Sequence, residues 1–193
     1  MQPCRIAADT IACQRGERLL FRGLSFTLEA GEALQVAGAN GLGKSSLLRI
    51  LAGLLTPLAG SVTRKGQVAL LDERPALDPH LPLGRALAFW AGLDASDGES
   101  ALAAMNLAGL AEVPVRHLST GQRKRAAMAR LIGQGADLWL LDEPYSGLDE
   151  VSRGGIDAMI RQALGQGCAC IIVSHQPIAL PGLSLLNLAD YAP

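Results

Sequence analysis

Gly38 opens the run Gly-Ala-Asn-Gly-Leu-Gly-Lys-Ser, which fits the pattern G-x-x-x-x-G-K-[ST]. A short apolar segment, Ala33–Ala37, leads directly into this run, and Lys44–Leu51 follows it with leucines at helical spacing. The run must therefore join the end of a buried strand to the start of a helix. Strands that alternate with helices build folds in which helices cover a mostly parallel sheet, so we expect that α/β architecture.

The same run has the composition of a phosphate site. Its glycines let amide N–H groups converge on an anion, and the helix that follows adds the positive end of its dipole. Lys44 supplies a positive charge to β- and γ-phosphates, and Ser45 offers a hydroxyl to Mg²⁺. A glycine-rich turn that merely opens an ordinary helix is the alternative, but the flanking strand and apolar helix favour a phosphate site. The expected nucleotide-binding residues here are Gly38, Ala39, Asn40, Gly41, Leu42, Gly43, Lys44, Ser45 and Ser46.

Composition limits the class of protein. With 193 residues, of which 49% are hydrophobic, the chain is long enough for one domain with a sizeable core. The net charge of -1 gives no electrostatic reason to expect nucleic acid as a partner. No apolar stretch reaches the roughly 18–20 residues of a membrane helix, and the N-terminus does not resemble a secretory signal, so we expect a cytosolic protein. The four cysteines are too scattered for a disulfide framework, and Cys168 and Cys170 are expected to pack as small apolar groups.

Apolar runs of strand length alternate with segments of helical periodicity. No strong strand pattern appears from about residue 83 to residue 132, so we expect that stretch to form a helical subdomain inserted between strands. The expected strands are Arg5–Ile11, Leu24–Leu28, Ala33–Ala37, Val68–Leu71, Asp137–Leu141 and Ala169–Val173. The expected helices are Lys44–Leu51, Arg85–Leu93, Ser100–Leu110, Gly121–Ile132 and Ile156–Leu164.

An acidic pair, Asp142-Glu143, follows one of these strands. A carboxylate at the end of a buried strand beside a phosphate loop can hold Mg²⁺, directly or through water, which is the role expected of Asp142. Glu143 would then point toward the γ-phosphate and polarise the attacking water as general base. Taken alone, an acidic pair after a strand is usually the start of a loop.

Leu-Ser-Thr-Gly-Gln at 118–122 supplies another anion site. Ser119 can cap the helix expected at Gly121–Ile132, so that its hydroxyl and the Gly121 N–H lie at a helix N-terminus. The basic run at 123–125 would by itself be interpreted as a solvated helix face. The glycine-rich run, this segment and Leu-Leu-Asp-Glu-Pro at 140–144, in this order, resemble the ATP-binding cassette (ABC) ATPases.

The resemblance implies ATP and Mg²⁺ as cofactors and a specific fold. That fold is a P-loop NTPase cassette with a mostly parallel core sheet, an antiparallel N-terminal β part and an inserted helical subdomain. We therefore expect a single ABC ATPase domain over 1–193, with a RecA-like core at about 1–75 and 136–193 and a helical signature subdomain at about 76–135.

The resemblance also implies a homodimer in which two copies enclose two ATP molecules. In such a dimer the signature segment of one copy binds the γ-phosphate held by the other copy. Asp149 matches the loop that crosses the dimer interface, and His175 matches a switch histidine that contacts the γ-phosphate and shares the catalytic role with Glu143. His80 and His117 have no such match and are expected at the surface. The signature residues are Ser119, Thr120, Gly121 and Gln122, of which Thr120 replaces the glycine of the commonest family spelling.

Two positions depart from the family pattern. Where the family stacks an aromatic ring on adenine, this chain has Arg15, whose guanidinium plane can also stack on a base. Where many members have a glutamine that touches Mg²⁺ and reports to the membrane partner, this chain has Arg74, preceded by Glu73, which could substitute as a Mg²⁺-facing group. Gln67 lies too early to fill that position.

Within the family, the short length, Arg15, the sequence from Leu118 to Leu131 and Ser-His-Gln-Pro at 174–177 resemble ATPase subunits of bacterial haem exporters in cytochrome c maturation. This implies a homodimer docked on integral membrane subunits at the cytoplasmic face of the inner membrane, without direct binding of haem or of a haem chaperone and without nucleic acid. The alternatives are an ATPase of another ABC exporter or importer, and a soluble ABC protein acting on nucleic acid or ribosomes. The latter usually needs a coiled-coil insertion or tandem cassettes, which are missing from this sequence. A P-loop kinase or GTPase has no use for the segment at 118–122.

Base recognition by Arg15 gives a first testable prediction. Stacking by a guanidinium lacks the hydrogen bonds that distinguish purines, so GTP should compete with ATP in a nucleotide competition assay. Stacking alone cannot give discrimination above about 10³-fold, which corresponds to roughly 4 kcal/mol. Stronger discrimination would mean that another residue reads the base.

Overall fold

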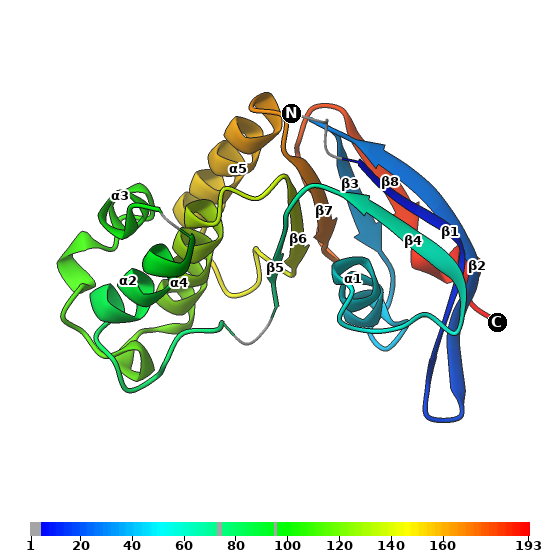
Figure 1. The fold of residues 1–193 in the computed structure, drawn as a ribbon, viewed down its shortest axis with the longest axis horizontal. Helices are drawn as coiled ribbons and strands as arrows, with labels where there is room; N and C mark the ends of the chain where they lie inside the picture. The colour runs from blue at the N-terminus through cyan, green and yellow to red at the C-terminus, as the bar shows by residue number, and fades with distance from the viewer. Residues whose placement is uncertain (1–4, 73–74, 95) are drawn as a thin grey trace.

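The larger of two sheets is parallel throughout and carries the glycine-rich run at the end of an inner strand (Figure 1). The computed structural model describes residues 5–72, 75–94 and 96–193. The strands of this sheet lie in the order β5-β6-β7-β3-β8. Every residue of β6 and β7 is buried, which explains why both strands are rich in apolar side chains. The bounds are β3 Ala33–Ala37, β5 Val68–Leu71, β6 Leu138–Asp142, β7 Ala169–Val173 and β8 Leu183–Asn187.

A smaller antiparallel sheet, in the order β2-β1-β4, is built from the N-terminal part of the chain. Its strands are β1 Arg5–Arg15, β2 Arg18–Glu29 and β4 Ala59–Lys65. Phe21 and Leu24 of β2 are fully buried and belong to one apolar cluster with the leucines of helix α1. The same cluster contains side chains from one face of the parallel sheet, so α1 is packed against both sheets.

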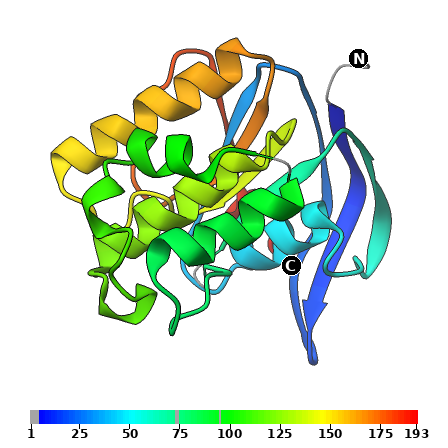
Figure 2. The same cartoon turned by 60° about the vertical axis from the view of Figure 1, so that its left-hand side comes forward.

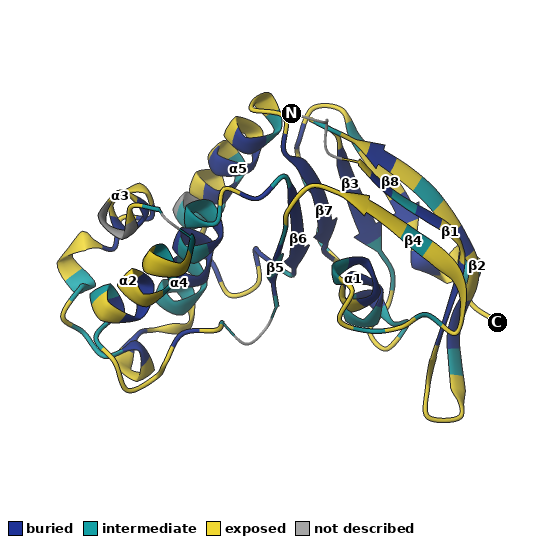
Figure 3. Ribbon diagram, in the orientation of Figure 1, coloured by how far each residue is buried: buried dark blue, intermediate teal, exposed yellow. Residues whose placement is uncertain are grey.

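The other helices cover the opposite face of the parallel sheet. Figures 1 and 2 show α2, α3 and α4 gathered at the end of the molecule away from the antiparallel sheet, with α5 beside them. Their buried side chains form a second apolar cluster with Trp139 of β6 and Ile172 of β7. In Figure 3 the buried strands β6 and β7 lie between two halves of the molecule. The helical half contains α2 to α5, and the other half contains α1 and the antiparallel sheet. The helices are α1 Lys44–Ala52, α2 Leu83–Asp94, α3 Gly98–Ala104, α4 Thr120–Gly133 and α5 Glu150–Gly165, with 3-10 turns at Ala108–Leu110, Val115–His117 and Leu188–Tyr191.

The fold class expected from the sequence is confirmed, and β3, β5 and β7 have the predicted bounds. The strands β1 and β2 are longer than expected because their pairing continues to the Arg15↔Arg18 pair at the hairpin turn. The strands β4 and β8 were not predicted, since neither presents a regular apolar face: β4 is exposed at nearly every residue. Within the described residues, no helix is long and apolar enough to span a membrane.

The helix expected over Ser100–Leu110 is wrong in its second half. The helix α3 ends at Ala104, and Asn106 has φ 53°, in the left-handed region that ends helices. The chain then makes a separate 3-10 turn at Ala108–Leu110. The apolar periodicity continues past this break because α3, the link after it and the 3-10 turn all contribute to one cluster, through Leu102, then Met105 and Leu107, then Leu110.

Candidate functional site

Three loops that carry predicted site residues leave the same edge of the parallel sheet. The glycine-rich run follows β3, Asp142-Glu143 lies at the end of β6, and His175 comes shortly after β7. These strands are neighbours in the order β6-β7-β3. Because the carboxyl ends of parallel strands meet at one edge, the fold brings the three groups together, as expected for a ligand site in an open α/β sheet.

Gly43 shows why the loop before α1 needs glycine. It caps the helix with φ 101°, a backbone conformation that residues with side chains rarely adopt. A Cβ atom at this position would lie 3.0 Å from Leu20 Cδ1 and 3.3 Å from Phe21 Cε1, both on β2. The antiparallel sheet therefore presses against the loop and helps to fix its shape.

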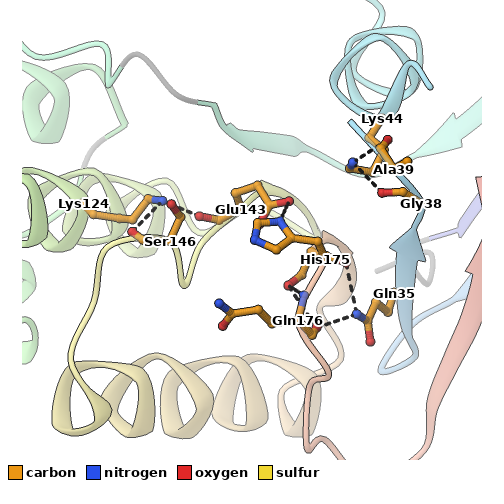
Figure 4. A network of polar contacts seen from close by, with 10 residues as sticks. Gln35, Gly38, Ala39, Lys44, Lys124, Glu143, Ser146, His175 and Gln176 are labelled. Carbon is orange, nitrogen blue, oxygen red and sulfur yellow. Dashed lines mark hydrogen bonds and ion pairs between the residues drawn. The ribbon is translucent and has the colours of Figure 1, made fainter. Parts of the chain in front are cut away.

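Lys44 directs its charge into that loop. Lys44 is only 7% exposed. Its Nζ donates to the carbonyl oxygens of Gly38 at 2.8 Å and Ala39 at 3.1 Å (Figure 4). A buried ammonium group is costly unless partners surround it, and these two carbonyls satisfy part of its donor capacity. The first-turn amides of α1 and this charge together make a site suited to a phosphate group.

Asp142 and Ser45 are the residues from which the sequence predicts oxygen ligands for Mg²⁺. Asp142 is the last residue of β6 and is 5% exposed, while Ser45 is half-buried in the first turn of α1, which packs against β6. A carboxylate and a hydroxyl are hard ligands of the kind that Mg²⁺ prefers, and Mg²⁺ usually keeps several waters or phosphate oxygens as its other ligands. The described residues contain no cluster of three or more His, Cys, Asp or Glu side chains.

Glu143 adopts a strained backbone conformation at the point where its strand ends. Its φ is 47°, in the left-handed region, and its N–H donates to the Val173 carbonyl at 3.0 Å. Its carboxylate Oε1 lies 2.8 Å from Nδ1 of His175 (Figure 4). Strain of this kind is typical of functional sites. The contact with His175 orients the carboxylate, which fits the role predicted for Glu143 as a base that activates water.

The turn that carries His175 is held by a residue that sequence reasoning did not single out. Gln35 lies in β3 and is 7% exposed, and its Nε2 donates to the carbonyls of Gln176 at 2.8 Å and Ser174 at 3.3 Å. The Ser174 hydroxyl accepts from the Gln176 N–H at 3.0 Å, which closes the turn. A polar residue inside the apolar strand Ala-Leu-Gln-Val-Ala was the available signal.

The segment at 118–122 begins α4 as predicted. The Ser119 hydroxyl accepts from the Gln122 N–H at 3.2 Å, and Gln122 Oε1 accepts from the Ser119 N–H at 2.8 Å, which makes a reciprocal capping box. A Cβ atom on Gly121 would lie 3.4 Å from Leu148 Cδ2, in ordinary contact. The helix start therefore lies beside the loop that follows Glu143, and Figure 4 shows Lys124 of α4 and Lys44 of α1 on opposite sides of Glu143.

Asp149 has a local role in this chain. It caps α5, with Oδ1 accepting from the Ser152 N–H at 2.8 Å, and this hydrogen bond lowers the pKa of its carboxyl group below the usual range. Its side chain is exposed, so it remains accessible to a second molecule. A role at a dimer interface stays a prediction.

Three further predictions concern the edges of the site. Arg15 is exposed at the end of β1, and its base-stacking role stays a prediction. Glu73 and Arg74 lie outside the described residues. The Ser46 side chain reaches the buried Cys13 thiol, whose pKa is raised by burial, so Ser46 connects α1 to β1.

The expected surface positions of His80 and His117 are confirmed, and both rings contact the Arg116 guanidinium. Cys168 and Cys170 are buried in an apolar cluster, as predicted.

The interpretation of the basic run at 123–125 as a solvated face is wrong. Lys124 and Arg125 are half-buried, and both donate to backbone carbonyls. Lys124 contacts the loop after β6, and Arg125 donates to the Met105 carbonyl at 3.2 Å. Neither contact is local in sequence, so helical periodicity alone could not reveal it.

Comparison with known proteins gives consistent results. The family model described as ABC transporter matches residues 21–146. The chain is 52% identical, over the whole length of both chains, to the cytochrome c biogenesis ATP-binding export protein CcmA of Novosphingobium aromaticivorans. It is 50% identical over 190 residues to the protein of the same name from Sphingopyxis alaskensis, covering 97% of this chain and 98% of that one.

Solved structures share the fold. An ABC transporter ATP-binding protein from Pyrococcus furiosus has a TM-score of 0.85 at 22% identity, covering 98% of this chain and all of that one. An inward-facing ABC transporter of metal-chelate type has a TM-score of 0.79 at 25% identity, covering 96% of this chain and 80% of that one.

The site predicts separate effects for two substitutions. Glu143→Gln keeps the shape of the side chain and a hydrogen bond to His175 but removes the negative charge. We expect kcat for ATP hydrolysis to fall by about 10²–10⁴-fold, the usual effect of losing a general base, with ATP still bound. Lys44→Ala should instead weaken binding of ATP. Phosphate release and binding of a fluorescent ATP analogue measure the two effects, and wild-type turnover by Glu143→Gln would refute the role of Glu143 as base.

Proposed function

The chain belongs to the ABC transporter family, and we propose that it is the ATPase subunit of an exporter that serves cytochrome c biogenesis. As a member of this family it is an ATPase whose hydrolysis is coupled to transport. The observation that carries the proposal is the 52% identity over both whole chains to an export protein of cytochrome c biogenesis. The arrangement of Lys44, Asp142, Glu143 and His175 at one sheet edge supports it.

Each of these residues has a distinct role in the proposed reaction. Lys44 and the amides of the glycine-rich loop bind the β- and γ-phosphates and orient the γ-phosphate for attack. Glu143 accepts a proton from the attacking water, and the hydrogen bond from His175 keeps its carboxylate in place. Ser45 and Asp142 would hold Mg²⁺, which neutralises phosphate charge. Arg15 would stack on the base.

A second copy of the chain completes the site in this proposal. Lys124, in the helix that Ser119 caps, and Lys44 lie on opposite sides of Glu143 (Figure 4), which fits a signature segment that serves another chain. In a head-to-tail homodimer, the segment Ser119–Gln122 would bind the γ-phosphate held by the other copy, and Asp149 would lie near the interface. Shared anionic ligands would then draw the two copies together.

Integral membrane subunits would dock on a groove between the two halves of the chain. This groove has a volume of about 330 Å³ and is lined by the end of α1, by Leu70 and Asp72, and by Arg130 of α4 and Gln134 directly after it. Leu54 at its edge is 70% exposed, so an apolar contact surface is available. The division into a core at about 1–75 and 136–193 and a helical subdomain at about 76–135 fits this docking mode.

The proposed location is the cytoplasmic face of the bacterial inner membrane. The transported species would be haem, or the ATPase would drive release of a haem-loaded chaperone, with contact made by the membrane subunits and not by this chain. The proposal does not involve nucleic acid.

The homodimer is tested by mixing two inactive variants, Lys44→Ala and Gly121→Asp. The aspartate would place a negative charge against the partner's γ-phosphate, while a Cβ at Gly121 makes only an ordinary contact, so folding should be preserved. A mixed dimer has one doubly defective site and one intact site, so the equimolar mixture should recover at most about one quarter of wild-type activity, since half of the dimers are mixed. Gly121→Asn is the neutral control. Full activity of Gly121→Asp alone would exclude the shared site.

The cellular role is tested by deleting the gene in its own host. We expect the deletion strain to lose haem-stained c-type cytochromes, and wild-type protein, but not Glu143→Gln, to restore them. Retention of normal c-type cytochromes in the deletion strain would instead assign the ATPase to another ABC transporter.

A further inference from the structure

We propose that Lys124 is a positioning residue that fixes the backbone of Glu143 from the helix that begins with the signature segment. The proposal rests on the role of Glu143 as base in the proposed function. It assigns to Lys124 an effect on turnover that acts only through Glu143.

The contacts of Lys124 carry the inference. Lys124 is half-buried in α4, and its Nζ donates to the carbonyl oxygen of Glu143 and, at 3.3 Å, to that of Ser146 (Figure 4). The ammonium group therefore bridges two carbonyls of the loop that follows β6. Hydrogen bonds from a charged donor are stronger than neutral ones, particularly when partly removed from water.

The backbone of Glu143 needs such support. A glutamate with φ 47° persists only where its surroundings hold it, because extended and helical conformations are otherwise favoured. The N–H of Glu143 is fixed by the Val173 carbonyl, and its carbonyl also accepts from the Ser146 N–H at 3.2 Å. Lys124 adds a third hydrogen bond to the Glu143 backbone, and this one comes from α4, outside the parallel sheet and its loops.

The neighbouring basic residue makes the contrast clear. Arg125 donates to the Met105 carbonyl, within the helical half of the chain, whereas Lys124 reaches across to the other half. A lysine suits this task because its long stem carries three donors on a single terminal atom.

The contact has a consequence for the two sites of the proposed dimer. The helix α4 starts with the residues that would bind the partner's ATP, and Lys124 lies in its second turn. A shift of α4 would therefore be transmitted to the base that acts on the chain's own ATP. In this way one chain would couple its signature segment, which binds the partner's ATP, to the base that acts on its own ATP.

A double-mutant cycle tests the proposal in the full-length protein. We expect Lys124→Met to lower kcat for ATP hydrolysis by about 10–100-fold with KM for ATP changed less than about 2-fold, because the loss affects orientation of the base and not phosphate binding. Lys124→Arg, which keeps a donor and the charge, should recover most of the rate. In the Glu143→Gln background, measured by single-turnover hydrolysis, Lys124→Met should change the rate by less than about 2-fold.

Lys65→Met is the matched control, since it removes the same side chain from an exposed position on β4. Far-UV circular dichroism and binding of a fluorescent ATP analogue check folding. If Lys124→Met does not fold, Lys124→Gln, which can donate to one carbonyl only, replaces it. An equal loss of rate in the wild-type and Glu143→Gln backgrounds would overturn the proposal, as would wild-type kcat in Lys124→Met. Wild-type turnover by Glu143→Gln alone would refute the proposed function instead, because it would show that Glu143 is not the base.

Discussion

The register of two parallel strand pairs determines the geometry of the whole site. Asp142 of β6 and Val36 of β3 both pair with Val173 of β7, one from each side. Because the three strands run in the same direction, the chain leaves them at the same level, and the glycine-rich loop, Glu143 and His175 follow side by side. A slip of one residue in either pairing would turn every side chain of that strand to the opposite face.

The same strands join the two halves of the molecule. Leu138 and Leu140 of β6 belong to the cluster that surrounds α1, whereas Trp139 and Leu141 belong to the cluster of the helical half. The alternation of a strand thus places successive residues in two separate cores. The helical half is held to the phosphate loop through this shared sheet, and polar contacts such as that of Lys124 with the Glu143 carbonyl add a connection at the site itself.

The sequence predicted those features that depend on local pattern. The strands β3, β5 and β7 are short apolar runs, and the cap at Ser119 follows from residue types at fixed spacing, so both were located correctly. The strand β4 was missed because its stability comes from pairing with β1 and not from an apolar face. Gln35 and Lys124 were missed as partners of the site because each contacts carbonyls far along the chain, which no local period reports.

The capping box at Ser119 has a consequence for association. Its two reciprocal hydrogen bonds order the first turn of α4 within a single chain, and the early amides of a helix have no acceptor inside the helix itself. The conformational entropy of that turn is therefore lost when the chain folds, and not when the nucleotide-bearing partner of the proposed dimer arrives. An approaching phosphate would meet a preorganised surface, so that more of its binding free energy remains available for closing the assembly and for releasing it again after hydrolysis.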